Sequence, residues 1–241
     1  MTGLQGKRVL VTGGTTGIGR ATVKLLADQG ARVLTFGRHE AELQASLANA
    51  GLPAQAGLIA DVADRNGLEV VFAALDERLG GIDALVACAA LGADPLAEME
   101  EDDWRYVVET NLVGYLACAD RALRRMEAQG GGHLLFVGSI STEIKAPGES
   151  VYAATKGGVK AFAETLRKEV ADRNIRVSVI EPGSVGSDMQ PCSPEEQREA
   201  ISRHEMLYAE EIAEAIVFAL TRSERCDVLN LRIEPRLQKT A

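Results

Sequence analysis

Short apolar runs alternate with longer segments of helical periodicity along the whole chain. The apolar runs predict strands at residues 8–11, 32–36, 57–60, 84–88, 134–137, 176–180 and 228–233. The longer segments predict helices at 17–29, 40–48, 66–79, 102–128, 152–172 and 209–220, with a shorter one at 194–202. Strands that alternate with helices favour a mostly parallel sheet with helices on both faces.

Two of the expected strands, Val9-Leu10-Val11 and Leu134-Leu135-Phe136-Val137, are apolar on both sides, as a doubly covered sheet requires. The chain has 241 residues, enough for one large α/β domain with a buried core. No repeat, low-complexity stretch or linker divides it. We therefore expect an α/β fold, with one domain over residues 1–241 and a doubly wound, mostly parallel seven-stranded sheet.

Composition excludes several classes of protein. A net charge of -9 argues against a nucleic-acid binder, which needs a basic surface to meet phosphates. No apolar run is long enough to span a bilayer, and the first residues carry no apolar signal segment, so we expect a cytoplasmic protein. The cysteines and histidines are scattered, which predicts reduced packing thiols and no metal site; they are Cys88, Cys118, Cys192, Cys226, His39, His133 and His204.

A glycine-rich turn lies between the first expected strand and its helix, in Thr12-Gly13-Gly14-Thr15-Thr16-Gly17-Ile18-Gly19-Arg20. Glycines let a pyrophosphate approach the backbone, and the helix N-terminus offers N–H groups and partial positive charge. A plain flexible turn is the alternative, but the position between strand and helix favours dinucleotide binding. The candidate cofactor contacts are Gly13, Thr15, Thr16, Gly17, Ile18 and Gly19.

Tyr152 and Lys156 are four residues apart in an expected helix, which places both side chains on one face. A nearby ammonium should lower the pKa of the phenol toward neutral. A phenol that exchanges its proton near neutral pH can act as a general acid or base. The spacing alone is weak, but downstream of a dinucleotide turn it indicates an oxidoreductase.

With these motifs in order, the chain resembles the short-chain dehydrogenase/reductase family. The matching features are T-G-x-x-x-G-I-G at residues 12–19, Asn111, Ser139, Tyr152 and Lys156. The resemblance covers nearly the whole chain and implies a Rossmann fold and a nicotinamide cofactor.

The resemblance also implies roles for the four catalytic candidates. Tyr152 donates its proton to a carbonyl oxygen, and Ser139 hydrogen-bonds the same oxygen. Lys156 binds the nicotinamide ribose and lowers the pKa of Tyr152, while Asn111 holds a water in a proton relay. Plainer interpretations stay open: Ser139 as a cap with Ser141 in its role, Asn111 as a helix-bending residue, Lys156 as solvated and Tyr152 as packing.

The cofactor preference is expected to depend on the end of the second strand, where an acid would bind a free ribose 2′-hydroxyl. Gly37 takes that place, and Arg38 follows it, suited to a 2′-phosphate. We therefore expect NADP(H) rather than NAD(H), with an exposed surface arginine as the alternative. By resemblance, Asp61 binds the adenine amino group and Val62 lines its pocket, although Asp61 could equally be a loop or helix-cap acid.

The segment Ala87-Cys88-Ala89-Ala90 departs from the N-N-A-G of the family. The first asparagine normally ties neighbouring strands together, so backbone or water must supply the lost hydrogen bonds. Ala90 adds a methyl group beside the cofactor path. We expect binding to survive, with Ala89 as a cofactor contact.

Pro182-Gly183-Ser184-Val185 resembles the family's P-G motif near the nicotinamide, which implies that Pro182, Gly183 and Val185 contact the cofactor. By the same analogy, residues 184–208 form a substrate lid. Met189, Pro191 and Cys192 would face the pocket, together with Ser139 and Tyr152. A plain surface loop is the competing interpretation of this segment.

We therefore expect an NADP(H)-dependent oxidoreductase that interconverts a carbonyl and a secondary alcohol. The alternatives are a nucleotide-binding sensor or structural subunit, and an epimerase or dehydratase with the same site. The expected partner is a modest, partly hydrophobic small molecule. Helices 102–128 and 152–172 permit a homo-oligomer, tetramer or dimer, and residues 234–239 form either a tail or an interface arm.

Overall fold

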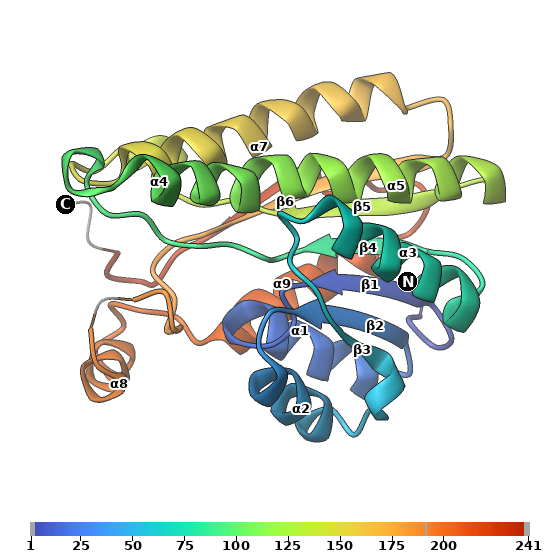
Figure 1. Cartoon of the computed structure of the whole chain (residues 1–241), viewed down its shortest axis with the longest axis horizontal. Coiled ribbons are helices and arrows are strands. Elements are labelled where there is room, and N and C mark those ends of the chain that lie inside the picture. Colours follow the sequence, from blue (N-terminus) through green and yellow to red (C-terminus); the bar gives the residue numbers. More distant parts are fainter. Residues whose placement is uncertain (1–2, 191, 239–241) are drawn as a thin grey trace.

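In the computed structural model, which describes residues 3–190 and 192–238, the strands form one parallel sheet (Figure 1). The spatial order is β3-β2-β1-β4-β5-β6-β7, as the doubly wound prediction requires. Chain order reverses between β1 and β4, and ligands of such sheets bind at this switch point. The strands are β1 (Arg8–Thr12), β2 (Arg32–Gly37), β3 (Gly57–Ile59), β4 (Ala84–Ala87), β5 (Gly132–Val137), β6 (Ile175–Pro182) and β7 (Asn230–Ile233).

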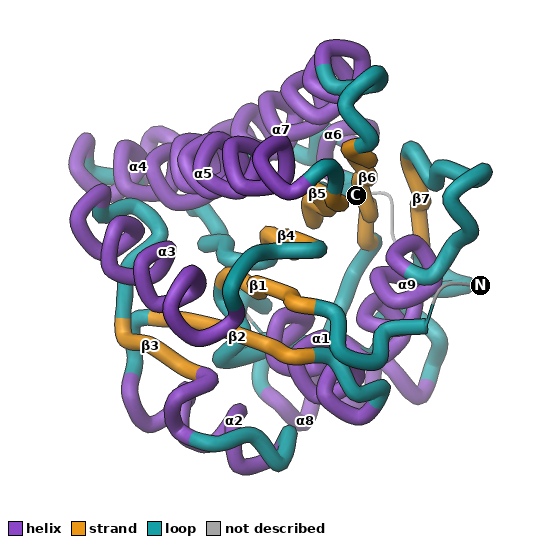
Figure 2. The backbone as a smooth tube through the Cα atoms, turned by 90° about the vertical axis from the view of Figure 1, so that its right-hand side faces the viewer, coloured by secondary structure: helices purple, strands orange, loops and turns teal. Residues whose placement is uncertain are grey.

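Helices cover both faces of the sheet (Figure 2). Successive strand residues point to opposite faces, so β1 sends Leu10 into one core and Val9 and Val11 into the other. The Leu10 core packs under α3 (Arg65–Leu79), α5 (Gly114–Gln129) and α7 (Ser150–Glu169). The Val9 core packs under α1 (Gly17–Asp28) and α9 (Ala209–Leu220), while α2 (Glu40–Asn49) packs beside α1.

The long helix expected at 102–128 is interrupted. It begins as α4 (Glu101–Val108), passes through a π-helical turn at Glu109–Val113, and continues as α5. Figure 1 shows the parts as one nearly straight rod above the sheet. Asn111 therefore lies in a local widening of the helix, which the sequence pattern does not reveal.

The remaining helical elements lie near the carboxyl edge of the sheet or in its connections. α6 (Ser141–Ile144) is too short to be expected from periodicity, whereas α8 (Pro194–Ser202) has the predicted bounds. Two 3₁₀ turns lie at Ala54–Ala56 and Leu96–Glu98. Among residues 3–190 and 192–238, no helix combines the length and apolarity that crossing a membrane needs.

Candidate active site

The glycine turn after β1 is too tightly packed for side chains. Gly13 has a φ of +66°, and a Cβ there would lie 2.6 Å from the Cα of Ala89. A Cβ at Gly19 would lie 2.1 Å from the carbonyl oxygen of Gly13. Thr16 caps α1 without a side-chain hydrogen bond, so its hydroxyl does not occupy the N–H groups of the first turn. The turn is therefore compact, and the first N–H groups of α1 are not capped by the Thr16 side chain.

A cleft of about 510 Å³ opens over this turn. All six glycine-turn residues expected to contact a cofactor line it, and so do Arg38, Asp61, Val62 and Ala89. The sequence motifs, which come from four separate strand ends, therefore meet around one continuous space. Its location is the switch point between β1 and β4, where this sheet topology places ligands.

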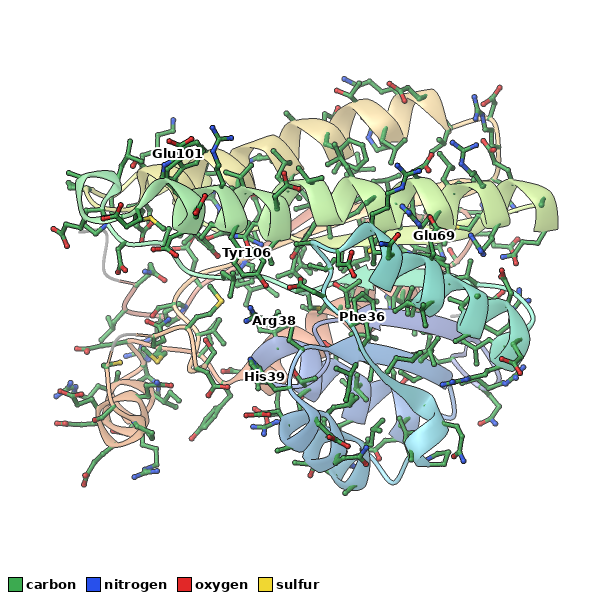
Figure 3. All side chains as sticks on the ribbon, viewed as in Figure 1. Phe36, Arg38, His39, Glu69, Glu101 and Tyr106 are labelled. Carbon is green, nitrogen blue, oxygen red and sulfur yellow. The ribbon has the colours of Figure 1, made fainter. Side chains whose placement is uncertain are left out.

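Tyr106 of α4 joins two of the expected residues, Arg38 and Asp61; Figure 3 labels Tyr106 and Arg38. The Arg38 guanidinium donates a hydrogen bond of 2.8 Å to the phenol oxygen of Tyr106. The phenol in turn donates to Asp61, whose other oxygen accepts from the Ala63 N–H at 2.9 Å. Tyr106 was not expected from the sequence, because no local motif marks it.

Two side chains hold the unusual loop after β4. The Thr12 hydroxyl oxygen accepts from the N–H groups of Cys88, at 3.1 Å, and Ala89, at 3.0 Å. The Asn111 amide accepts from the Leu91 N–H at 2.8 Å and donates to its carbonyl at 2.7 Å. Side chains from β1 and the π-helical turn therefore hold this loop, and the replacement of the missing asparagine's own hydrogen bonds by backbone or water stays a prediction.

Asn111 is completely buried, and its amide group is used by the loop. A further contact of 3.5 Å reaches the Thr155 hydroxyl on α7. The side chain thus fixes the β4 loop and α7 relative to the π-helical turn. Its part in a water relay stays a prediction.

Ser139 and Tyr152 share a second cavity, of about 590 Å³, beyond the end of β5. Ser141 lines it as well, as the rival for the role of Ser139. The Ser139 oxygen accepts from the Ser141 N–H at 3.1 Å, and its hydroxyl donates to the Ser141 hydroxyl at 3.1 Å. Met189 lines both cavities, so the two spaces adjoin along this residue.

Lys156 lies one helical turn after Tyr152, but the hydrogen bonds of its ammonium go to groups other than the Tyr152 hydroxyl. It donates to the Val137 carbonyl at 2.9 Å and to the phenol oxygen of Tyr115 at 3.3 Å. Burial lowers the pKa of Lys156 to about 8. The Nζ atom lies 5.8 Å from the ring centroid of Tyr152, over the ring.

The expected fall in the pKa of Tyr152 is wrong for this structure. Burial raises its pKa to about 12, and interaction with the Ser139 hydroxyl only partly offsets this. Burial removes the water that would stabilise the phenolate of Tyr152, and the Lys156 ammonium, which donates its hydrogen bonds to Val137 and Tyr115, does not take the place of that water. At neutral pH Tyr152 is therefore a protonated phenol, which is the form of a general acid.

Tyr115 is a second phenol in this centre that the sequence did not reveal. Its side chain is completely buried, and its hydroxyl donates to the Val137 carbonyl at 3.3 Å. Lys156 Nζ lies 4.9 Å from its ring centroid, within cation–π range. Burial raises the pKa of Tyr115 well above its ordinary value, so it meets the lysine as a neutral group.

Only some of the residues expected to form the site after β6 line the two cavities. Gly183 lines the 590 Å³ cavity, and Pro182 is the last residue of β6. Val185 is buried in the core and bridges to Leu207. Cys192 is not among the residues that line either cavity, and Pro191 lies outside the described residues.

Comparison with known proteins assigns the family. The sequence model described as short chain dehydrogenase matches residues 7–198. The chain belongs to this family of oxidoreductases. One curated member is the 3-oxoacyl-(acyl-carrier-protein) reductase FabG of Vibrio cholerae. It is 34% identical to the present chain, and the match covers 82% of this chain and 81% of the relative. The chain is also 35% identical to carbonyl reductase family member 4 of Xenopus laevis, over 87% and 89% of the two chains.

Solved structures agree with this assignment. An actinorhodin polyketide ketoreductase variant with NADPH superposes with a TM-score of 0.85 at 27% identity, covering 98% of this chain and 99% of the other. A short chain dehydrogenase from Burkholderia cenocepacia in complex with NADP gives 0.84 at 28% identity, covering 97% and 98%. The short-chain dehydrogenase described here therefore shares its whole fold with nucleotide-bound enzymes.

Proposed function

We propose that this protein is an NADP(H)-dependent oxidoreductase that interconverts a carbonyl and a secondary alcohol. The observation that carries the proposal is the position of Tyr152 and Ser139 in one cavity, adjoining the glycine-turn cleft. FabG and the carbonyl reductase among its relatives are reductases by name, which supports the same class of reaction.

The residues present fit a dinucleotide phosphate. A Cβ at Gly13 or Gly19 would collide with Ala89 or with the Gly13 carbonyl, so the compact turn requires glycine at both positions. Thr16 does not cap the first turn of α1 with its side chain, which leaves the N–H groups of that turn available to a phosphate. A Cβ at Gly37 would lie 2.4 Å from Thr15, so an acid cannot enter there unless Thr15 moves. Arg38 is left to meet a 2′-phosphate, and the nucleotides in the titles of two structural neighbours, NADPH and NADP, support this preference.

The other cofactor contacts are proposals of the same kind. Asp61, Val62 and Ala89 would hold the adenine half, with the P-G segment and Lys156 near the nicotinamide half; that segment contributes Pro182, Gly183 and Val185. When bound, the nicotinamide supplies or accepts the hydride. The protein's own residues then have to hold the substrate oxygen and manage one proton.

Tyr152 donates its phenolic proton to the substrate oxygen in the reductive direction. The Ser139 oxygen is held by the Ser141 N–H, so its own hydrogen can turn from Ser141 toward that substrate oxygen. Because the pKa of Tyr152 is about 12, the protonated form that reduction requires is the one present at neutral pH. Residues 184–208 would form the lid over the substrate. Met189 already lines the cavity, whereas Cys192 would touch the substrate only if this segment moved toward it.

A reductase assay tests the proposal. Purified protein with NADPH and a panel of ketones should lose the absorbance of reduced nicotinamide. Tyr152→Phe should lower kcat by about 10²- to 10⁴-fold with NADPH binding unchanged, as for loss of a general acid. NADPH binding without turnover across the panel would instead favour the sensor, and a changed substrate without net cofactor consumption would favour an epimerase or dehydratase.

A further inference from the structure

Tyr106 connects two charged residues that face the same end of the cofactor cleft. Arg38 follows β2, Asp61 follows β3, and both line the 510 Å³ cleft, whereas Tyr106 does not. The phenol accepts from Arg38 at 2.8 Å and donates to Asp61. The guanidinium carbon also lies 5.6 Å from the centroid of the Tyr106 ring. Tyr106 thus contacts both residues without lining the cleft itself.

The Tyr106 hydroxyl lies between the positive charge of Arg38 and the negative charge of Asp61. Among the described residues, no direct ion pair joins Arg38 to an acid, although Asp61 is its neighbour across the phenol. A neutral hydroxyl can donate to a carboxylate and accept from a guanidinium at once. Each charged group is therefore oriented without being neutralised, so the positive charge of Arg38 is preserved for an anionic ligand.

The donor role of Tyr106 is stable across physiological pH. Partial burial and the hydrogen bond to Asp61 raise the pKa of Tyr106, with Arg38 acting in the opposite direction. The phenol consequently keeps its proton, and its orientation between the two charges does not reverse.

We propose that Tyr106 is a positioning residue that strengthens the preference for a ribose 2′-phosphate by keeping Arg38 apart from Asp61. The inference rests on the proposed use of NADP(H), but it concerns a different residue. Without the hydroxyl, Arg38 and Asp61 are free to pair directly, and a 2′-phosphate then has to compete with the carboxylate for the guanidinium. A ligand with a free 2′-hydroxyl makes no such demand.

The test compares binding of 2′,5′-ADP with binding of 5′-AMP, two probes that differ only in the 2′-phosphate. Titration calorimetry on the full chain would use the wild type, Tyr106→Phe, Arg38→Met and the double variant. We expect Tyr106→Phe to weaken 2′,5′-ADP about tenfold and to leave 5′-AMP within about twofold. In the Arg38→Met background the same exchange should leave the ratio of the two affinities unchanged.

Each arm has a contrary outcome. Equal weakening of both probes by Tyr106→Phe would show a packing role only, and an effect that persists without Arg38 would also overturn the proposal. If Arg38→Met alone leaves the ratio unchanged, the NADP(H) preference itself fails and the inference with it. Should Tyr106→Phe unfold, Asp61→Asn replaces it as the probe. Because Tyr106 already keeps the carboxylate away from Arg38, the ratio of the two affinities should stay within about twofold of the wild type. A rise of about tenfold would show that Asp61 competes for Arg38 in spite of Tyr106, and would contradict the proposal.

Discussion

His133 lies at the amino end of β5, the end opposite the active site, and we expect it to make the free energy of unfolding depend on pH. It is the second residue of β5, and 3% of its surface is exposed. One ring nitrogen, Nε2, lies 2.8 Å from the Ser178 hydroxyl, while Nδ1 has no hydrogen-bond partner among residues 3–190 and 192–238. Burial, with a smaller effect of Arg176, lowers the pKa of His133 to about 3.

The sign of the effect follows from the two states. In the unfolded chain the imidazole takes up a proton near its ordinary pKa of about 6.5, whereas the folded protein keeps it neutral down to about 3. The unfolded state therefore binds more protons below about pH 6.5, and the free energy of unfolding falls as the pH falls. Between about pH 7 and pH 5 the loss amounts to about 2 kcal/mol.

This pH range isolates His133 from the other shifted groups. The lowered pKa values of Asp83 and Glu143 cost stability mainly below their unfolded pKa values, at still lower pH. Lys156, with its pKa lowered to about 8, penalises folding fully below that value and less as the pH rises above it. Neither effect changes much between about pH 7 and pH 5.

Urea unfolding at the two pH values, followed by circular dichroism, measures the loss. His133→Asn should be less stable overall but nearly independent of pH over this range. His39→Asn, at an exposed histidine, is the matched control and should retain the wild-type loss of about 2 kcal/mol. An equal loss in the wild type and in His133→Asn would refute the reasoning.

Two further predictions concern the site. Because the pKa of Lys156 is lowered to about 8, kcat/KM for ketone reduction should fall above about pH 8 as the ammonium loses its proton. In Lys156→Arg this fall should move to higher pH, because a guanidinium keeps its charge. If a pH–rate series shows the fall at the same pH in the variant, another group causes it. Gly13→Ala should weaken NADPH by at least about tenfold and cost about 1–3 kcal/mol of stability, from the clash with Ala89 and the left-handed backbone. Gly51→Ala is the control in the same titration and melting assays and should keep NADPH affinity, because Gly51 has a φ of +64° and no atom of the described part of the chain lies within 4 Å of the added Cβ.

The fold was predictable because its signals are local and repeated. An apolar run between helical segments is what a strand buried on both faces requires, so the element order and sheet type followed. The π-helical turn at Glu109–Val113 was not predictable in this way. Its flanking residues, Val108 and Gly114, keep α-helical dihedral angles, so one widened turn leaves the surrounding apolar periodicity nearly intact.

The same distinction separates the site residues that were foreseen from those that were missed. The glycine turn, Ser139 and Tyr152 belong to motifs at strand ends, where topology brings them together. Tyr106 acquires its importance from partners 45 and 68 positions away, Asp61 and Arg38. Tyr115 likewise depends on Lys156, 41 positions away. Contacts at such separations are set by tertiary packing and leave no spacing in the sequence.

The error over Tyr152 shows why spacing alone does not determine a pKa. Four residues of separation put Lys156 on the correct helix face, but its hydrogen bonds go to neutral oxygens of Val137 and Tyr115. The lysine is itself buried, so its own charge is already costly and its pKa is lowered. A phenol buried beside such a group has its anion destabilised by lost hydration, and its pKa rises. The pair of residues that suggested a general acid or base with a pKa near neutral therefore forms an acid that keeps its proton until a substrate oxygen takes it.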